Sequence, residues 1–123
     1  MKKEIAMKWA DALESGEYDQ GKHALHARRN EFCCLGVLCD ISKLGDWESG
    51  FNANGYVPKR HTAGLGGALV LPDFVQAWSG LTSNKGEFTG AVNDESLTLT
   101  RLNDRGVPFT KIAKYIRKYY DKL

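Results

Sequence analysis

Apolar residues near the two ends of the chain recur at helical spacing. In residues 3–15 they fall on one face of a helix, and Gly16 follows as a residue type that commonly ends one. In residues 109–120 they again share one face, while basic residues occupy the others. The apolar positions are Ile5, Trp9, Ala12 and Leu13 in the first segment and Phe109, Ile112, Ala113, Ile116 and Tyr120 in the second. The pattern predicts an amphipathic helix at each end, the second one basic.

The most apolar stretch of the chain, FCCLGVLCDI, covers residues 32–41. Cys34, Leu38 and Ile41 recur within it at helical spacing, which predicts a buried helix. Gly36 lies inside this helix, where glycine costs roughly 1 kcal/mol of stability against alanine. We therefore expect another backbone to pack closely against Gly36.

Turn-forming residues dominate the segments on either side of this helix. Residues 21–28 alternate loosely between apolar and polar, and with residues 31–33 they predict a hairpin whose turn contains Arg29 and Asn30. Residues 45–67 interleave Gly, Asn and Pro with aromatic residues, which indicates a long loop carrying one or two short strands.

Two shorter helices are predicted in the second half of the chain. Pro72 suits the first turn of a helix that ends at Gly80, and Ser96 can cap another that ends before Gly106. Residues 69–71 are compatible with a strand. The elements predict an α+β fold: a small single domain over the whole chain, with four to five helices packed against short antiparallel strands or hairpins. The expected core residues are Ile5, Trp9, Leu13, Leu35, Leu38, Ile41, Leu99, Leu102, Phe109, Ile112 and Ile116.

Composition places the chain among ordinary globular cytoplasmic proteins. Its 123 residues, 42% of them hydrophobic and 26% charged, suffice for one core and do not suggest disorder. Charged residues interrupt the amino terminus before a signal peptide could form, and no apolar stretch is long enough for a membrane span. The three cysteines are an odd number and two are adjacent, which argues against a secreted disulfide framework. We expect no contact with membranes.

The adjacent cysteines Cys33 and Cys34 are the candidate nucleophiles of the chain. They lie where a strand would lead into a helix, and a helix amino terminus can lower the pKa of a thiol. A histidine base oriented by a carboxylate would complete a cysteine-dependent hydrolase or transferase. Free cysteine, however, is among the most buried residue types, so we favour inert packing and predict no catalytic residue. The candidate bases are His23 and His26, and the candidate orienting carboxylates are Asp40 and Asp104.

Neither metal nor cofactor binding is predicted. Cys33, Cys34 and Cys39 cannot all face one ion from a single helix, and His23 and His26 are suitably spaced only if their segment is helical. A glycine cluster in residues 64–67 lacks the spacing and the lysine of a phosphate-binding P-loop, so we interpret it as a loop.

The carboxy-terminal third resembles the beginning of a helix-turn-helix, LNDRGVPFTKIAKYI. A recognition helix should follow, yet the chain ends at Leu123, so we do not expect a reader of specific duplex DNA. The net charge of +2 is small, and the placement of the basic residues therefore matters more than their sum.

A binding site for an anion is the functional alternative to catalysis. Arg101 and Arg105 lie one turn apart on a predicted helix, and arginine donates paired hydrogen bonds to phosphate. Lysines of the last helix, Lys111, Lys114 and Lys118, could extend the patch. If the ligand is a nucleotide, an aromatic ring could stack on its base. The candidate ligand-binding residues are Tyr18, Lys22, Arg28, Arg29, Tyr56, Arg101 and Arg105.

Three stretches carry a resemblance to a group of small proteins familiar from bacteriophages and prophages. They occur in the same order there, with Cys-Cys-Leu-Gly as the most specific part, and the match omits residues 45–92. Pro108 stands where a serine is usual before the last helix. The stretches are Tyr18-Asp19-Gln20-Gly21, Phe32-Cys33-Cys34-Leu35-Gly36-Val37-Leu38-Cys39-Asp40, and Leu102-Asn103-Asp104-Arg105-Gly106 with Phe109 and Ile112-Ala113.

The resemblance implies a viral accessory protein of the bacterial host cytoplasm rather than a particular reaction. Such a protein would act by binding, for example as an anti-defence factor that binds a host protein or sequesters an anionic, nucleotide-like small molecule. A homo-oligomer is compatible with this expectation. The alternative is the cysteine-dependent hydrolase or transferase that uses Cys33 or Cys34.

Overall fold

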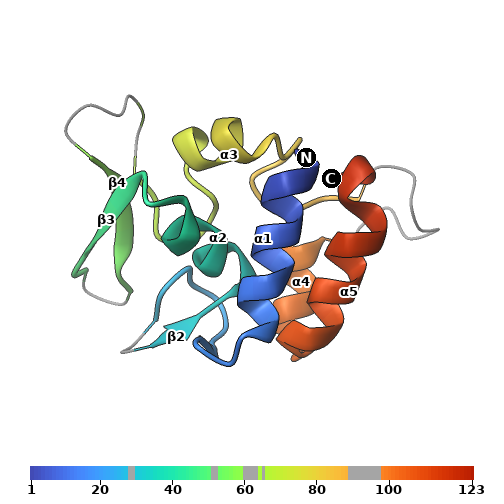
Figure 1. The fold of residues 1–123 in the computed structure, drawn as a ribbon. Coiled ribbons are helices and arrows are strands. Elements are labelled where there is room, and N and C mark those ends of the chain that lie inside the picture. The colour runs from blue at the N-terminus through green and yellow to red at the C-terminus, as the bar shows by residue number, and fades with distance from the viewer. Residues whose placement is uncertain (28–29, 51–52, 60–63, 65, 89–97) are drawn as a thin grey trace.

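The computed structural model describes residues 1–27, 30–50, 53–59, 64, 66–88 and 98–123 (Figure 1). Within them it has five α-helices and two pairs of short strands, which confirms the predicted α+β fold. The helices are α1 (Lys3–Glu14), α2 (Cys34–Ser42), α3 (Asp73–Ser79), α4 (Leu99–Asp104) and α5 (Phe109–Tyr119), followed by a 3₁₀ turn, η1 (Tyr120–Lys122). The strands are β1 (Asp19–Gln20), β2 (Glu31–Phe32), β3 (Gly45–Glu48) and β4 (Gly55–Pro58).

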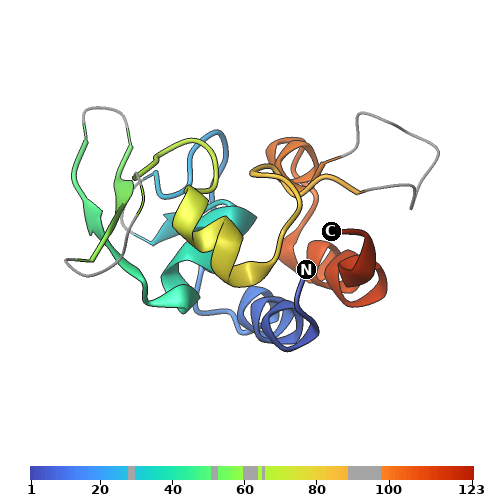
Figure 2. The same cartoon turned by 90° about the horizontal axis from the view of Figure 1, so that it is seen from above.

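Helices α1 and α5, from the two ends of the chain, lie side by side, and the β3–β4 hairpin lies at the opposite end of the molecule from α5 (Figure 1, Figure 2). Arg117 on α5 forms ion pairs with Asp11 and Glu14 on α1. The backbone N–H of Thr82 also donates to the carbonyl of Leu123 at 2.7 Å. The two terminal helices therefore pack together, and both bury their apolar faces in one core. None of the described helices has the length and apolar character needed to cross a membrane.

One contiguous core joins the helices. Nine of the eleven expected core residues are buried, and the other two, Ile5 and Ile41, are half-buried and pack against the same cluster. The three cysteines are free and buried in it. The helical phases predicted from apolar spacing are therefore confirmed.

The close approach expected at Gly36 is present. A Cβ atom built on Gly36 would lie 1.8 Å from the carbonyl oxygen of Leu25. The same oxygen accepts a hydrogen bond of 3.1 Å from the N–H of Cys33. The segment before α2 thus lies directly against the backbone of the helix, where only glycine leaves room.

The predicted hairpin of residues 21–33 forms in part. Strand β2 pairs in parallel with β1, which precedes the segment taken for the first hairpin strand. The expected antiparallel pairing is limited to a bridge between His26 and Phe32 with two flanking backbone hydrogen bonds. The N–H of Ala27 donates to the carbonyl of Glu31 at 3.0 Å, and the N–H of Cys33 donates to the carbonyl of Leu25 at 3.1 Å. The chain turns at His23, whose φ of 67° is incompatible with an extended strand.

The remaining elements follow the sequence with local differences. Strands β3 and β4 form an antiparallel pair with Trp47 opposite Tyr56, and α3 ends at Gly80 in the left-handed conformation, as expected. Residues 69–71 do not form a strand, and the first two of them form bends. The predicted cap Ser96 lies outside the described residues, and the residue that caps α4 is Thr98.

Candidate functional site

A buried hydrogen-bond network joins the three stretches that carry the phage-protein resemblance. Its centre is Asn103 on α4, whose side chain is fully buried. The Asn103 amide nitrogen donates to the carbonyl of Gly21 at 2.8 Å, and its oxygen accepts from the N–H of Cys34 at 3.2 Å. Gln20 donates to the same oxygen at 3.0 Å. These motif residues therefore have a structural role, because they fix α4 against β1 and α2.

Gln20 also holds the turn between α4 and α5. Its amide nitrogen donates to the carbonyl of Val107 at 2.7 Å, and its oxygen accepts from the N–H of Phe109 at 3.1 Å. Pro108 is the N-cap of α5, but its side chain cannot accept a hydrogen bond from the helix. Gln20 instead satisfies the N–H of Phe109, one of the unpaired donors in the first turn of α5.

Tyr18 is occupied by a second network rather than presented to a ligand. Its hydroxyl donates to Asp40 at 2.5 Å, and the indole N–H of Trp47 donates to the other oxygen of that carboxylate at 3.1 Å. Burial, with the Asp40 carboxylate beside it, raises the pKa of Tyr18. The ring packs edge-on against Phe32, so its predicted role in stacking on a base has no support from this arrangement.

Tyr56 is placed where it cannot stack on a ligand, and this candidate needs correction. Its side chain is 1% exposed, and its ring packs between Trp47 and Phe74. Its hydroxyl accepts a hydrogen bond of 2.9 Å from the N–H of Gly45. The turn-rich sequence around it gave no sign that this part of the chain folds over the core.

The cysteines lack the environment of a nucleophile. Cys33 does cap α2, and its sulfur accepts from the N–H of Gly36 at 3.4 Å. Burial nevertheless outweighs this bond and raises the pKa of Cys33 to about 11. Burial also raises the pKa values of Cys34 and Cys39. The alternative of a thiol pKa lowered by the helix terminus is therefore not met, and the predicted burial of the cysteines is confirmed.

One histidine–carboxylate pair of the catalytic hypothesis does form. The Nδ1 atom of His23 lies 3.5 Å from Asp104, which also accepts a hydrogen bond of 2.9 Å from the N–H of His23. His26 instead stacks on Phe32 and contacts Asn54. Because Asp104 holds the backbone as well as the ring, the pair fixes the turn at His23 against α4. Within the described part of the chain, no three His, Cys, Asp or Glu side chains form a group that could hold a metal ion.

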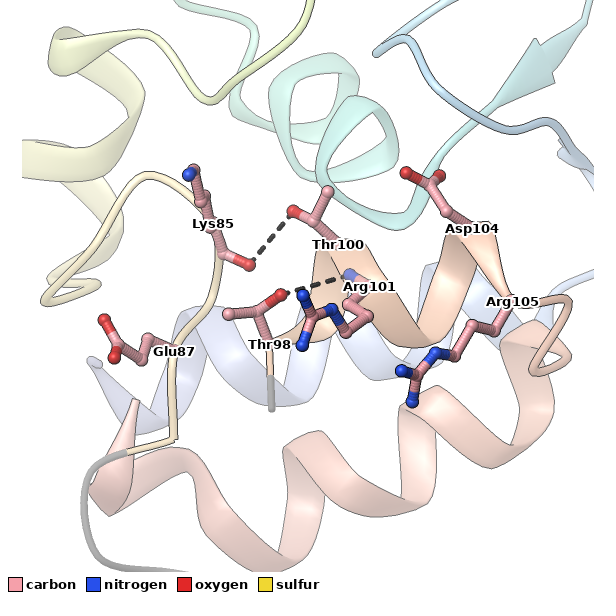
Figure 3. Close-up of a pocket in the computed structure, with 7 residues that line it drawn as sticks. All are labelled: Lys85, Glu87, Thr98, Thr100, Arg101, Asp104 and Arg105. Carbon is pink, nitrogen blue, oxygen red and sulfur yellow. Dashed lines mark hydrogen bonds between the residues drawn. The ribbon is translucent and has the colours of Figure 1, made fainter. Parts of the chain in front are cut away.

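A cavity of about 570 Å³ lies against α4 and contains the predicted arginine pair. Figure 3 shows Arg101 and Arg105 extending on the same side of α4. The opposite wall is the segment that contains Lys85 and Glu87. Among the described residues, the lining consists of Lys85, Glu87, Thr98, Thr100, Arg101, Asp104 and Arg105.

Backbone pairing fixes the two walls of this cavity. The N–H of Leu99 donates to the carbonyl of Gly86 at 2.9 Å, and Glu87 forms an antiparallel bridge with Thr98. The carbonyl of Lys85 accepts from both the N–H and the hydroxyl of Thr100, at 3.2 and 3.0 Å. The cavity is thus a consequence of how residues 85–87 meet the first turn of α4.

The charge of the cavity is positive but mixed. Lys85, Arg101 and Arg105 contribute cations, and Glu87 and Asp104 contribute carboxylates. The Asp104 carboxylate is engaged by His23, and the two arginines point away from it (Figure 3). The arginine end of the cavity therefore holds two of the three cations in its described lining.

The other predicted cations that the structure describes do not line this cavity. Lys22 is exposed, and its Nζ is 3.5 Å from a Cβ built on Gly106, so the amino-terminal segment does reach the end of α4. Arg28 and Arg29 lie outside the described residues. Of the last helix, Lys118 lies over the ring of Tyr119, and its lysines do not line the cavity.

Sequence reasoning missed four lining residues, Lys85, Glu87, Thr98 and Thr100. Thr98 had a local signal, because threonine before an apolar helical pattern is a preferred cap. Lys85 and Glu87 had none, since they reach the site only through pairing between the segments before and at the start of α4.

Comparison with known proteins gives a family without an activity. A family model described as Domain of unknown function (DUF8296) matches residues 1–120. No curated protein matches the chain, and neither does any solved structure.

Proposed function

The chain belongs to the DUF8296 family, and we propose that it acts by binding a phosphate-bearing small molecule in the cavity beside α4. The observation that carries this proposal is the convergence of Arg101 and Arg105 on one cavity. Their guanidinium groups give planar, paired donors that match phosphate oxygens. The volume of about 570 Å³ is in the usual range for small-molecule sites.

Thr98 adds a neutral donor between the cavity walls. Its hydroxyl oxygen accepts from the N–H of Arg101 at 3.1 Å, and the same residue begins α4. A hydroxyl that accepts one bond still has its own hydrogen to donate, and no acceptor for that hydrogen is seen among the described residues. A phosphate oxygen beside Arg101 would accept it.

The environment of the cysteines argues against nucleophilic catalysis, and so favours a function by binding. A cysteine nucleophile reacts as the thiolate and must be reached by its substrate. Cys33 is 4% exposed with a pKa of about 11, and Cys34 is fully buried. The cysteine-dependent hydrolase or transferase therefore has less support than an anion site on the surface.

The proposal includes the setting that the phage-protein resemblance implies. A viral protein that sequesters a nucleotide-like signal in the bacterial cytoplasm needs affinity and no turnover. Recognition by arginines, a threonine hydroxyl and a lysine is sufficient for such a role.

Charge reversal at the two arginines tests the proposal. The double variant R101E/R105E should lose binding of nucleoside triphosphates in isothermal titration calorimetry, and wild-type affinity should fall as salt is raised. The matched control is K111E/K114E, which makes the same change in net charge on exposed positions of α5. Both variants should melt close to wild type, since exposed substitutions usually change stability by about 0.5 kcal/mol or less.

Two results would overturn the anion site. One is the absence of binding by wild type to any phosphate-bearing probe. The other is equal affinity of wild type and R101E/R105E, which would move attention to a protein–protein surface and a pull-down from host lysate.

A further inference from the structure

We infer that the cavity recognises a phosphorylated ribose and leaves a nucleotide base unread, an inference that rests on the proposed phosphate site. Phosphate oxygens only accept hydrogen bonds, so they complement the arginines but not the carboxylates of the same cavity. A ligand that carries phosphate at one end and hydroxyl groups at the other matches both kinds of lining residue.

Of the two carboxylates, Glu87 is separated in space from the arginines, whereas Asp104 lies with them on α4. Figure 3 shows the Glu87 carboxylate at the opposite end of the cavity from Arg105, with Thr98 between Glu87 and Arg101. An anion bound at the arginines would be repelled by Glu87 if it filled the whole cavity. A sugar at the Glu87 end would instead donate its hydroxyls to the carboxylate, a charge-assisted bond.

Thr100 contributes a further acceptor to the lining. Its hydroxyl hydrogen is donated to the carbonyl of Lys85 at 3.0 Å, so only its oxygen lone pairs remain for a ligand. The Thr98 hydroxyl differs, because its oxygen accepts from the N–H of Arg101 and its hydrogen can be donated to a ligand. The cavity thus presents donors toward the arginine end, and it adds acceptors that bare phosphate cannot use.

No aromatic ring is among the residues that line the cavity in the described structure. Tyr18 and Tyr56, the rings predicted to stack on a base, are occupied by Asp40 and by the core. Base stacking is the usual way to hold a nucleobase without reading its edge. Since the described lining offers no ring for such stacking, we expect the sugar and the phosphate to be the recognised parts of the ligand.

The test compares ligands that differ in one part. The probes are inorganic phosphate, ribose 5-phosphate, 2-deoxyribose 5-phosphate and the four ribonucleoside triphosphates, titrated calorimetrically into wild-type protein. Ribose 5-phosphate should bind about tenfold tighter than inorganic phosphate, the gain expected from one charge-assisted hydrogen bond. The four triphosphates should agree with one another within about threefold, because no base contact separates them.

The substitution Glu87→Ala should affect the two ligands in opposite directions, which a general loss of folding cannot do. The variant should bind ribose 5-phosphate about tenfold more weakly and inorganic phosphate equally or more tightly, since a negative charge is removed. The matched control is Glu48→Ala on β3, an exposed residue at the far end of the molecule (Figure 1). Glu87 is exposed, and its backbone N–H bond to Ser83 at 2.9 Å does not involve the carboxylate.

The outcomes separate the two proposals. If no phosphate-bearing probe binds, the phosphate site itself is wrong. If inorganic phosphate binds as tightly as ribose 5-phosphate, or Glu87→Ala lowers both equally, the phosphate site stands and the sugar inference is wrong. A preference of about tenfold for one triphosphate would also overturn the inference, because it requires a contact to the base.

Discussion

The side-chain amides of Gln20 and Asn103, 83 positions apart in the chain, form a hydrogen bond of 3.0 Å. Both amides make further bonds, so this contact ties β1 to α2, to α4 and to the start of α5. Helix α4 carries the two arginines of the candidate site. The position of the site therefore depends on a polar contact inside the molecule, not only on the apolar core.

Asn103→Ala should strongly destabilise the protein. The substitution leaves the Gly21 carbonyl and the Cys34 N–H without their partner, and removes one acceptor from Gln20. Because each buried polar group left unsatisfied costs about 1–3 kcal/mol, we expect a loss of about 3 kcal/mol or more in the free energy of unfolding. Urea unfolding followed by circular dichroism measures it.

The matched control for this change is Asn84→Ala. Asn84 is exposed, and the bond that it makes to the N–H of Leu71 comes from its backbone carbonyl. We expect a change within about 0.5 kcal/mol. If Asn103→Ala costs no more than Asn84→Ala, the network is not a determinant of stability.

Gly36→Ala should be far more harmful than Gly55→Ala. A Cβ at position 36 would meet the Leu25 carbonyl oxygen at 1.8 Å, whereas the nearest atom to a Cβ at position 55 is 3.8 Å away. Neither glycine has a positive φ, so the comparison isolates the close contact. Overpacking of a core costs about 1–3 kcal/mol or more, and a thermal melt of both variants should show the difference. Equal melting temperatures would mean that the segment of Leu25 moves away at no cost.

Much of this fold follows from apolar periodicity. The faces predicted for α1, α2 and α5 are the buried faces, because a helix that must bury one stripe shows that stripe at helical spacing. The close contact at Gly36 could also be predicted from the sequence. Glycine is unfavourable inside a helix, so its presence in this apolar helix indicated a packing reason. Local physics decides these elements.

The pairing of distant segments was not readable in the same way. Strand β2 pairs with β1, and residues 85–87 pair with the start of α4, through backbone groups that every residue possesses. Side-chain patterns therefore do not reveal the partners. This is why the arginine pair of the site was predicted while its opposite wall was missed, and why Tyr56 was taken for an exposed ring.

The thiols of α2 should react slowly in the folded protein. Cys33 is 4% exposed, and burial holds its pKa at about 11, so at neutral pH it is protonated and shielded. An aromatic disulfide reagent should therefore label the native chain far more slowly than the chain in urea. Rapid labelling of folded protein at neutral pH would revive the cysteine-dependent enzyme as the better hypothesis.

The same burial predicts that the protein loses stability in alkali. The pKa of Cys33 is raised from 9.0 to about 11, so between these values the unfolded chain has released a proton that the folded chain retains. The contribution of Cys33 to the free energy of unfolding should be level below about pH 9 and fall by about 3 kcal/mol as the pH rises through 11. Cys34, Cys39 and Tyr18, whose pKa values are also raised, add to the fall.

Cys33→Ser keeps an acceptor for the Gly36 N–H but does not titrate in this range, so urea unfolding across the pH series should show a shallower fall. Identical slopes in wild type and variant would contradict the assignment to Cys33.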